Sequence, residues 1–361
     1  MRLRFVAIVV LLIGYSVRAE DPMAAVETVL QKRFPANKPG AAVLILKKGE
    51  PLLMKGYGLA DIAAKTPITP DSAFDMASVS KQFTAMAVMQ LAERGQLGYD
   101  DEVRKWIPEL PEFEAPRPIK IRDLLNQTSG LTDYLVFWKD SDEEFARLRN
   151  ADLPALFRGK KLQFDPGTKF DYSNSNYALL PLIVERASGK CLASWLSTNV
   201  FCPLEMTSSR VMDDPKIEIR NRVTGYSQAL LSRKFELSRR DGPVCGDGNV
   251  FTTVRDLAKW DAGLAANKLV RAETLELAYT PVNVPDFKTG KNSNYGFGWD
   301  VAKAKDGSKI VWHNGGWAGT RTSISRFLAD GLTIAVLCNN EDADADDVAM
   351  AVAKILRKPA E

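Results

Sequence analysis

Residues 77–94 constrain the fold most, because they predict a helix that is apolar on nearly every side. Strong helix formers fill the segment, Gly and Pro are absent from it, and Gly95 stands where a helix would end. A helix without a polar face packs in the centre of a large domain. A chain of 361 residues is long enough to build such a domain around it.

Ser78 and Lys81 stand three residues apart in the first turn of this helix, so their side chains project from one face. A hydroxyl beside an amine, at the positive end of a buried helix, is one way in which hydrolases make serine nucleophilic. The alternative is that Ser78 only caps the helix and that the Lys81 stem reaches toward solvent. A Ser-x-x-Lys spacing by itself does not decide between them.

Strand patterns gather toward the two ends of the chain, and helical patterns fill the middle. We expect strands at 41–46, 52–57, 295–301, 309–313, 320–327 and 332–337, with helices at 23–34, 252–265 and 344–356. No strand is expected between residue 99 and about residue 245, where helices alternate with Pro-rich connections. Short links between the late strands favour antiparallel pairing.

These patterns predict a mixed α/β (α+β) fold of two domains. Residues 20–98 and 245–361 would form an antiparallel sheet flanked by helices. Residues 99–244 would form an all-helical insert.

Residues 1–19 are typical of a secretory signal peptide, with a basic start, a short apolar run and small residues before Glu20. The apolar run is too short to span a bilayer, and no later run is long enough. No Cys lies near the cleavage point, so a lipid anchor is not expected. We therefore expect a secreted or periplasmic protein without a transmembrane segment.

Charge and cysteine content exclude several functions. The formal net charge is +3, and the leader carries three arginines, so the mature chain is neutral and lacks the basic stripe of nucleic-acid binding. The single His and the absence of a C-x-x-C spacing argue against zinc, and we expect no metal and no cofactor. Disulfide pairing and oligomeric state stay open. The four cysteines are Cys191, Cys202, Cys245 and Cys338.

Two further motifs carry groups suited to catalysis. Tyr172-Ser-Asn174 follows a turn and precedes a predicted helix, a place where catalytic side chains often lie. His313-Asn-Gly315 ends a predicted strand and leads into Gly316, where a substrate's backbone can approach closely. Either motif alone is more often structural.

Taken together, the three motifs resemble the penicillin-recognising serine hydrolases: class C β-lactamases, D,D-peptidases and related serine esterases. The resemblance extends over essentially the whole mature chain. It includes Leu124-Leu-Asn-Gln-Thr-Ser-Gly-Leu131, Phe164-Asp-Pro-Gly-Thr-Lys-Phe-Asp-Tyr-Ser-Asn174, Asp256-Leu-Ala-Lys-Trp260 and Tyr295-Gly-Phe-Gly-Trp299. It implies a β-lactamase/transpeptidase-like fold and a small-molecule or peptide-like substrate.

The resemblance also implies roles for individual residues. Ser78 would attack an amide or ester carbonyl, with either Lys81 or Tyr172 as the base. Asn174 would orient Lys81, and His313 would deliver a proton or bind a carboxylate. The oxyanion and substrate would be bound by Ser78, Gly315, Gly316, Tyr134 and Trp317.

Two departures bear on the activity. His313-Asn-Gly315 stands where β-lactamases of the group carry Lys-Thr-Gly, which argues against efficient β-lactam hydrolysis. Gln127 stands where many relatives have His. An esterase, a D,D-peptidase or a β-lactamase all remain possible activities, and the alternative outside the enzymes is a non-catalytic penicillin- or peptidoglycan-binding protein.

Overall fold

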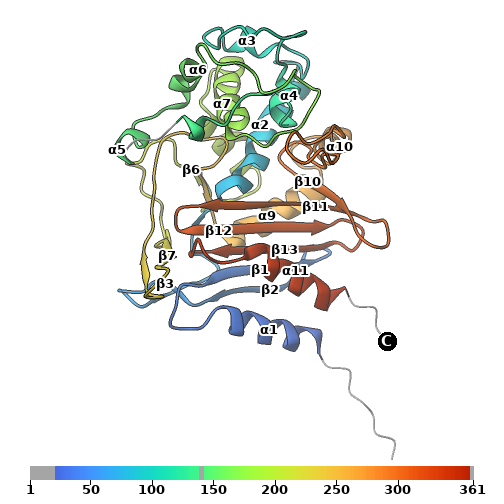
Figure 1. Cartoon of the computed structure of the whole chain (residues 1–361). Coiled ribbons are helices and arrows are strands. Elements are labelled where there is room, and N and C mark those ends of the chain that lie inside the picture. Colours follow the sequence, from blue (N-terminus) through green and yellow to red (C-terminus); the bar gives the residue numbers. More distant parts are fainter. Residues whose placement is uncertain (1–20, 138–141, 358–361) are drawn as a thin grey trace, which may run out of the picture.

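The computed structural model describes residues 21–137 and 142–357 (Figure 1). The expected leader at 1–19 lies outside these residues. The expected mixed fold is confirmed: Figure 1 shows one main sheet with helices on both sides and a largely helical part above it.

The main sheet has six antiparallel strands in the order β10-β11-β12-β13-β1-β2. Its strands are β1 (Ala41–Lys47), β2 (Glu50–Tyr57), β10 (Asp300–Lys303), β11 (Lys309–Trp317), β12 (Thr320–Phe327) and β13 (Leu332–Cys338). The two ends of the chain meet in its middle, because β1 pairs with β13 from Ala41 opposite Cys338 to Lys47 opposite Leu332.

Both faces of the sheet are buried, which explains why residues 41–46 are apolar without alternation. Helices α1 (Pro22–Arg33) and α11 (Ala345–Leu356) cover one face, where Val43 and Ile45 pack with them. Helix α9 (Val254–Ala265) and the turn η1 (Ala77–Ser80) cover the other face, and Leu44 belongs to that core.

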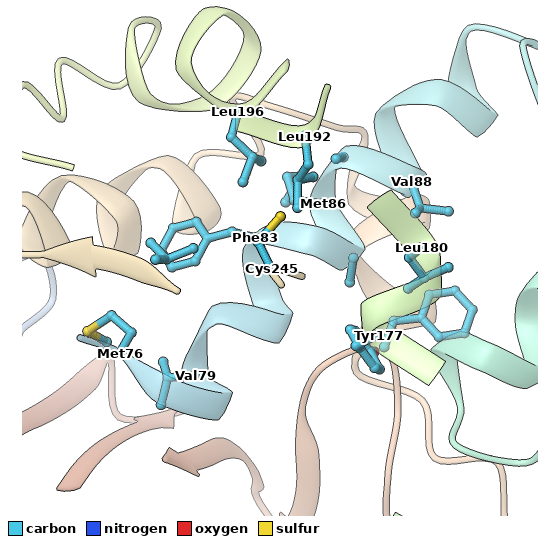
Figure 2. Close-up of a cluster of buried hydrophobic side chains, with 14 of the residues drawn as sticks. Met76, Val79, Phe83, Met86, Val88, Tyr177, Leu180, Leu192, Leu196 and Cys245 are labelled. Carbon is cyan, nitrogen blue, oxygen red and sulfur yellow. The ribbon is translucent and has the colours of Figure 1, made fainter. Parts of the chain in front are cut away.

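The central helix α2 (Lys81–Glu93) is buried from Lys81 to Leu91. It contacts α7 (Asn174–Ser188) and α8 (Leu192–Leu196), and Figure 2 shows Phe83, Met86 and Val88 of α2 among the side chains of these helices. Phe83 also lies 4.4 Å from Trp260 of α9, measured between ring centroids. One helix therefore joins the sheet part to the helical part.

The remaining elements are short. The helices are α3 (Val103–Trp106), α4 (Ile121–Leu125), α5 (Asp142–Phe145), α6 (Leu153–Leu156) and α10 (Ala272–Ala278), with single turns η1 (Ala77–Ser80), η2 (Tyr134–Val136), η3 (Asn150–Asp152) and η4 (Ser197–Phe201). The strands are β3 (Leu59–Asp61), β4 (Thr66–Pro67), β5 (Phe74–Asp75), β6 (Arg210–Val211), β7 (Tyr226–Gln228), β8 (Phe235–Leu237) and β9 (Val250–Thr252).

Three details differ from the sequence prediction. Strands β6, β7 and β8 lie between residues 99 and 244, where none was expected; two or three residues are too few to show alternation. The segment 295–299 is not a strand, because Gly298 has a φ of +75° and extended pairing begins at Asp300. Conversely, β11 continues past His313 to Trp317. The domain boundaries at residues 98 and 245 stay a prediction.

Two further findings concern membrane-spanning helices and the cysteines. No helix in the described ranges 21–137 and 142–357 is long and apolar enough to cross a membrane. All four cysteines are free thiols, with Cys245 and Cys338 buried and Cys202 exposed.

Candidate active site

The turn η1 places Ser78 at the start of the central helix. Ala77 adopts a left-handed φ of +46°, which non-glycine residues rarely do, and its N–H donates to Asp75 Oδ1 at 2.8 Å. Ser78 faces a cavity, whereas Ser80 is fully buried and its Oγ accepts the Val250 N–H at 3.0 Å. The geometry therefore separates a serine that faces the cavity from a buried, hydrogen-bonded one two residues away.

Lys81 is fully buried, and three oxygens surround its amine. The Nζ atom lies 3.0 Å from Ser78 Oγ, 2.9 Å from Asn174 Oδ1 and 2.8 Å from the backbone oxygen of Asp247. Burial lowers the pKa of Lys81 to about 8, while the negative charges of Asp247 and Asp133 oppose that shift. An amine with such a pKa loses its proton at about pH 8, where an ordinary lysine stays charged.

Asn174 is oriented by Asp133. One carboxylate oxygen, Oδ2, accepts both the backbone N–H and the side-chain Nδ2 of Asn174 at 2.9 Å, and Oδ1 accepts the Leu135 N–H. Because Nδ2 is held by the carboxylate, the amide oxygen must face Lys81. The expected contact between Asn174 and Lys81 is therefore present, with Asp133 behind it.

Tyr172 lies beneath the amine of Lys81, which is 4.9 Å from the centroid of its ring. Its hydroxyl is buried without a hydrogen bond of ordinary geometry, although Ser78 is close enough to lower its pKa somewhat. Burial dominates and raises the pKa of Tyr172 well above its usual range. The phenol stays protonated in this environment.

His313 lies behind Tyr172, with 6.1 Å between the two ring centroids, and exposes only 2% of its surface. Its Nδ1 is 2.6 Å from the backbone oxygen of Asn314, which can only accept, so Nδ1 carries the proton. Its Nε2 then accepts from the Tyr295 hydroxyl at 3.0 Å. Burial, with the nearby Lys81 charge, lowers the pKa of His313 to about 3.

These contacts bear on the expected roles of His313. A neutral imidazole does not bind a carboxylate by charge, and the role of His313 stays a prediction. Both ring nitrogens are engaged in the interior, facing Tyr295 and the backbone of Asn314.

Gly315 and Gly316 bring β11 against η1. A Cβ on Gly315 would lie 2.5 Å from the Met76 oxygen and 3.0 Å from the Ala77 Cβ, so only glycine fits there. Strand β10 pairs with β11 only as far as Trp312, which leaves the edge beyond it without a neighbour on that side. Backbone groups near Gly316 can therefore face a substrate.

A cavity of about 140 Å³ lies beside Ser78. Tyr134, Asn174, Gly316 and Trp317 line it, four residues that the sequence predicted for the site. Lys81, Tyr172 and His313 do not line the cavity. Lys81 lies behind Ser78, Tyr172 lies beside Lys81, and His313 lies behind Tyr172. The structure thus brings all the predicted residues together, and their catalytic roles stay predictions.

The sequence did not point to several residues that support this arrangement. Asp247 accepts the Tyr134 hydroxyl at 3.1 Å, lines the cavity, and has a pKa raised to about 6 by burial. Gln127 accepts from the Ser173 N–H and from Asn176 Nδ2, so it fixes the loop that carries Tyr172 and Asn174. The sequence signal for Asp247 was an acid between two glycines; Gln127 had none beyond its departure from the family pattern.

A metal site needs several ligating side chains close together. Within the part of the chain that the structure describes, no group of three or more His, Cys, Asp or Glu side chains could hold a metal ion.

Comparisons with known proteins place the chain in a family. The family model described as Beta-lactamase matches residues 28–357. Penicillin-binding protein 4* of Bacillus subtilis (strain 168) is 31% identical over 331 residues, which cover 88% of this chain and 71% of the relative. A D-aminopeptidase of Brucella anthropi is 29% identical, and there the match covers 88% of this chain but only 59% of the relative.

A solved structure gives the same fold. The penicillin-binding protein from Bacillus halodurans superimposes with a TM-score of 0.78 at 25% identity, over 92% of this chain and 98% of that one. The family match extends over nearly all the described residues and includes every predicted site residue. The chain therefore belongs to the beta-lactamase family and is a serine hydrolase of that family.

Proposed function

We propose that this protein cleaves a small amide or ester through an acyl intermediate on Ser78, with neutral Lys81 as the general base. One observation carries the proposal, namely the set of acceptors around the Lys81 amine. Asn174 Oδ1 and the Asp247 backbone oxygen can only accept hydrogen bonds. The Nζ atom also donates to Ser78 Oγ, 3.0 Å away. Once the ammonium has lost one proton, the amine keeps its bonds to Asn174 and to the Asp247 oxygen, and its lone pair is left to take the Ser78 proton.

The same argument distinguishes Lys81 from Tyr172 as the base. Burial moves the two groups in opposite directions: it lowers the pKa of Lys81 to about 8 and raises that of Tyr172. A general base works best with a pKa near the operating pH. Lys81 meets that condition, and Tyr172 acts as a neutral phenol beside the serine.

The reaction follows from these positions. Ser78 Oγ attacks the carbonyl carbon as its proton passes to Lys81 Nζ, and the electron pair of the C=O bond moves to the oxygen. The backbone N–H groups of Ser78 and Gly316 bind that oxyanion, and one such donor stabilises a transition state by about 3 kcal/mol. Collapse of the intermediate expels the amine or alcohol, which takes the proton from Lys81. Water then attacks the ester, restoring Ser78 and releasing the acid.

The substrate class is supported by the cavity and by the relatives. A cavity of about 140 Å³ beside Ser78 suits a small group. Two curated relatives are named D-aminopeptidase, so N-terminal D-amino-acid amides are the first amides to test. This chain spans 59% and 63% of the lengths of these two relatives, so the activity of the whole relative is not assigned to it. Secretion through the leader at 1–19 is part of the proposal.

Intact-mass spectrometry tests the nucleophile. A fluorophosphonate should add one adduct to the wild type and to Ser80→Ala, and none to Ser78→Ala. Hydrolysis of p-nitrophenyl acetate should show the same pattern. Labelling of Ser78→Ala at the wild-type rate would contradict the proposal.

Turnover separates an enzyme from a binding protein. We expect an ester or a D-amino-acid amide to be consumed over many cycles, with release of the free acid. A stable acyl adduct without turnover on p-nitrophenyl esters, D-alanine amide, a D-Ala-D-Ala peptide and nitrocefin would favour the non-catalytic binding protein instead.

A further inference from the structure

The β7–β8 hairpin carries the most exposed apolar side chains of the described residues. Leu231 is 97% exposed, Leu230 is 88% exposed and Leu237 is 76% exposed; no other large apolar side chain in the described ranges exceeds 60%. Exposed leucines scattered singly need no explanation, but two adjacent ones at the tip of a turn, with a third on the next strand, form a patch. We call residues 229–234 the hairpin tip.

Hydrogen bonds give the hairpin tip a defined shape. The Ala229 N–H donates to the Lys234 oxygen, and the Arg233 N–H donates to the Ala229 oxygen, both at 2.9 Å. The Gln228 side chain adds a bond from its Nε2 to the Arg233 oxygen. The backbone therefore satisfies its own polar groups, and the two leucines are presented outward.

The turn between β3 and β4 lies beside the base of the hairpin. The Ile62 N–H donates to the Tyr226 hydroxyl, which ties that turn to the first residue of β7, and Figure 1 shows β3 and β7 side by side. At the other end of β7, the hairpin tip exposes Arg233 and Lys234 beside its leucines. The hairpin tip thus combines two exposed apolar side chains with two basic ones.

Two acidic side chains lie near the hairpin tip. Glu236 pairs with Ser227, so it lies on the face opposite to that of Phe235 and Leu237. Asp342 accepts the Gln228 N–H at the start of the tip, which engages one of its carboxylate oxygens. Residues 229–234 themselves include two basic and no acidic side chains.

We propose that the hairpin tip docks on an anionic phospholipid surface, with Leu230 and Leu231 entering the headgroup boundary. Apolar side chains flanked by Lys and Arg are the signature of interfacial binding, because burial of the apolar part adds to the attraction of anionic lipids. A second copy of the chain is a poorer fit, since a stable protein interface buries about 800 Å² on each partner and a two-leucine tip is far smaller. The proposal is independent of the chemistry at Ser78.

Vesicle co-sedimentation tests it. The mature protein should sediment with vesicles of phosphatidylglycerol and phosphatidylcholine in equal parts and remain in solution with phosphatidylcholine alone. Raising NaCl from about 0.1 M to about 1 M should weaken binding, because the Debye length shortens. Leu230→Ser/Leu231→Ser should bind at least about tenfold more weakly, and Arg233→Glu/Lys234→Glu should lose the preference for anionic lipid.

Met350→Ser is the matched control, because Met350 is 55% exposed on α11, away from the hairpin. It should bind vesicles as the wild type does, and all variants should retain p-nitrophenyl ester hydrolysis and a wild-type melting temperature. Absence of wild-type sedimentation, or equal binding by Leu230→Ser/Leu231→Ser, would overturn the proposal. So would a dimer in analytical ultracentrifugation, without lipid, that the double serine variant abolishes.

Discussion

The Asp133 carboxylate controls the amine of Lys81 through Asn174. One carboxylate oxygen receives both N–H groups of Asn174, and the amide oxygen then receives a proton of Lys81 at 2.9 Å. The chain of contacts leads from a loop acid to the proposed base without touching the substrate. Asp133 is thus a positioning residue, and it also acts on Lys81 by its charge.

The pH dependence of catalysis should report Lys81 directly. Burial disfavours the ammonium, so its proton leaves at about pH 8 rather than near 10.5. Below that pH Lys81 is protonated and cannot accept from Ser78; above it the amine is neutral and active. We therefore expect kcat/KM for a p-nitrophenyl ester to rise with pH through about 8 and then level off.

Lys81→Met keeps the length of the side chain and removes the base, so kcat/KM should fall by roughly 10²–10⁴-fold. Lys190→Met, at an exposed position, is the control and should behave as the wild type. A rising limb that persists unchanged in Lys81→Met would contradict the assignment.

Replacing Asp133 by Asn should change the rate and the pH limb together. The new amide has one acceptor oxygen, so its Nδ2 must oppose either the Leu135 N–H or the two N–H groups of Asn174. Either arrangement places two donors against each other in the loop that orients Asn174 toward Lys81. We expect kcat/KM to fall by about 10²-fold.

The sign of the accompanying shift follows from charge. Asp133 stabilises the ammonium of Lys81, so its loss should move the rising limb below pH 8. Asp306→Asn, in an exposed loop, should leave both the rate and the limb unchanged. A slower Asp133→Asn enzyme with the wild-type limb would indicate a purely structural role.

Local spacing explains why part of this site could be predicted from the sequence. Ser78 and Lys81 are near neighbours on one turn, and Tyr172 and Asn174 belong to one short loop, so their proximity follows from backbone geometry. Asp133 and Asp247 are brought to Lys81 by the tertiary fold from 52 and 166 residues away in the chain. A local sequence pattern cannot predict contacts between residues so far apart in the chain.

The fold, too, could be predicted only where the sequence pattern is long enough. Long strands such as β1 and β13 were predicted because seven apolar or alternating residues leave a clear pattern, whereas β6 has two residues. His313 was expected at the end of a strand, close to the substrate. The Gly315 and Gly316 that follow it continue the strand instead, because β11 must lie close to the η1 backbone.

The single histidine makes the state of His313 directly measurable. Its imidazole proton signals in NMR should not titrate between about pH 5 and pH 8, because burial and the charge of Lys81 lower its pKa to about 3. Protein without a histidine tag is required for a single set of signals. A midpoint near 6.5, the ordinary value for histidine, would show that the ring reaches solvent.

Tyr295→Phe complements that measurement. The change removes the hydroxyl that donates to His313 Nε2 and leaves a buried acceptor unpaired, which costs about 1–3 kcal/mol of unfolding free energy. The limb near pH 8 should stay, because Tyr295 does not contact Lys81 in the proposed mechanism. Tyr57→Phe is the control, because Tyr57 is a buried tyrosine whose hydroxyl bonds Glu27 far from the site.

Gly315→Ala tests whether the close approach of β11 to η1 holds Ser78 in position. The added Cβ would meet the Met76 oxygen and Thr322 Oγ1, both at 2.5 Å, so either the strand or the turn must move. Overpacking of this kind costs about 1–3 kcal/mol of unfolding free energy. Because Ala77 and Ser78 follow Met76 directly, kcat/KM should fall by about 10²-fold even in the fraction that remains folded.

Gly98→Ala is the matched control, since its Cβ would meet nothing closer than 3.6 Å, and it should change neither quantity. Wild-type activity and stability in Gly315→Ala would show that the two elements are not held together as described.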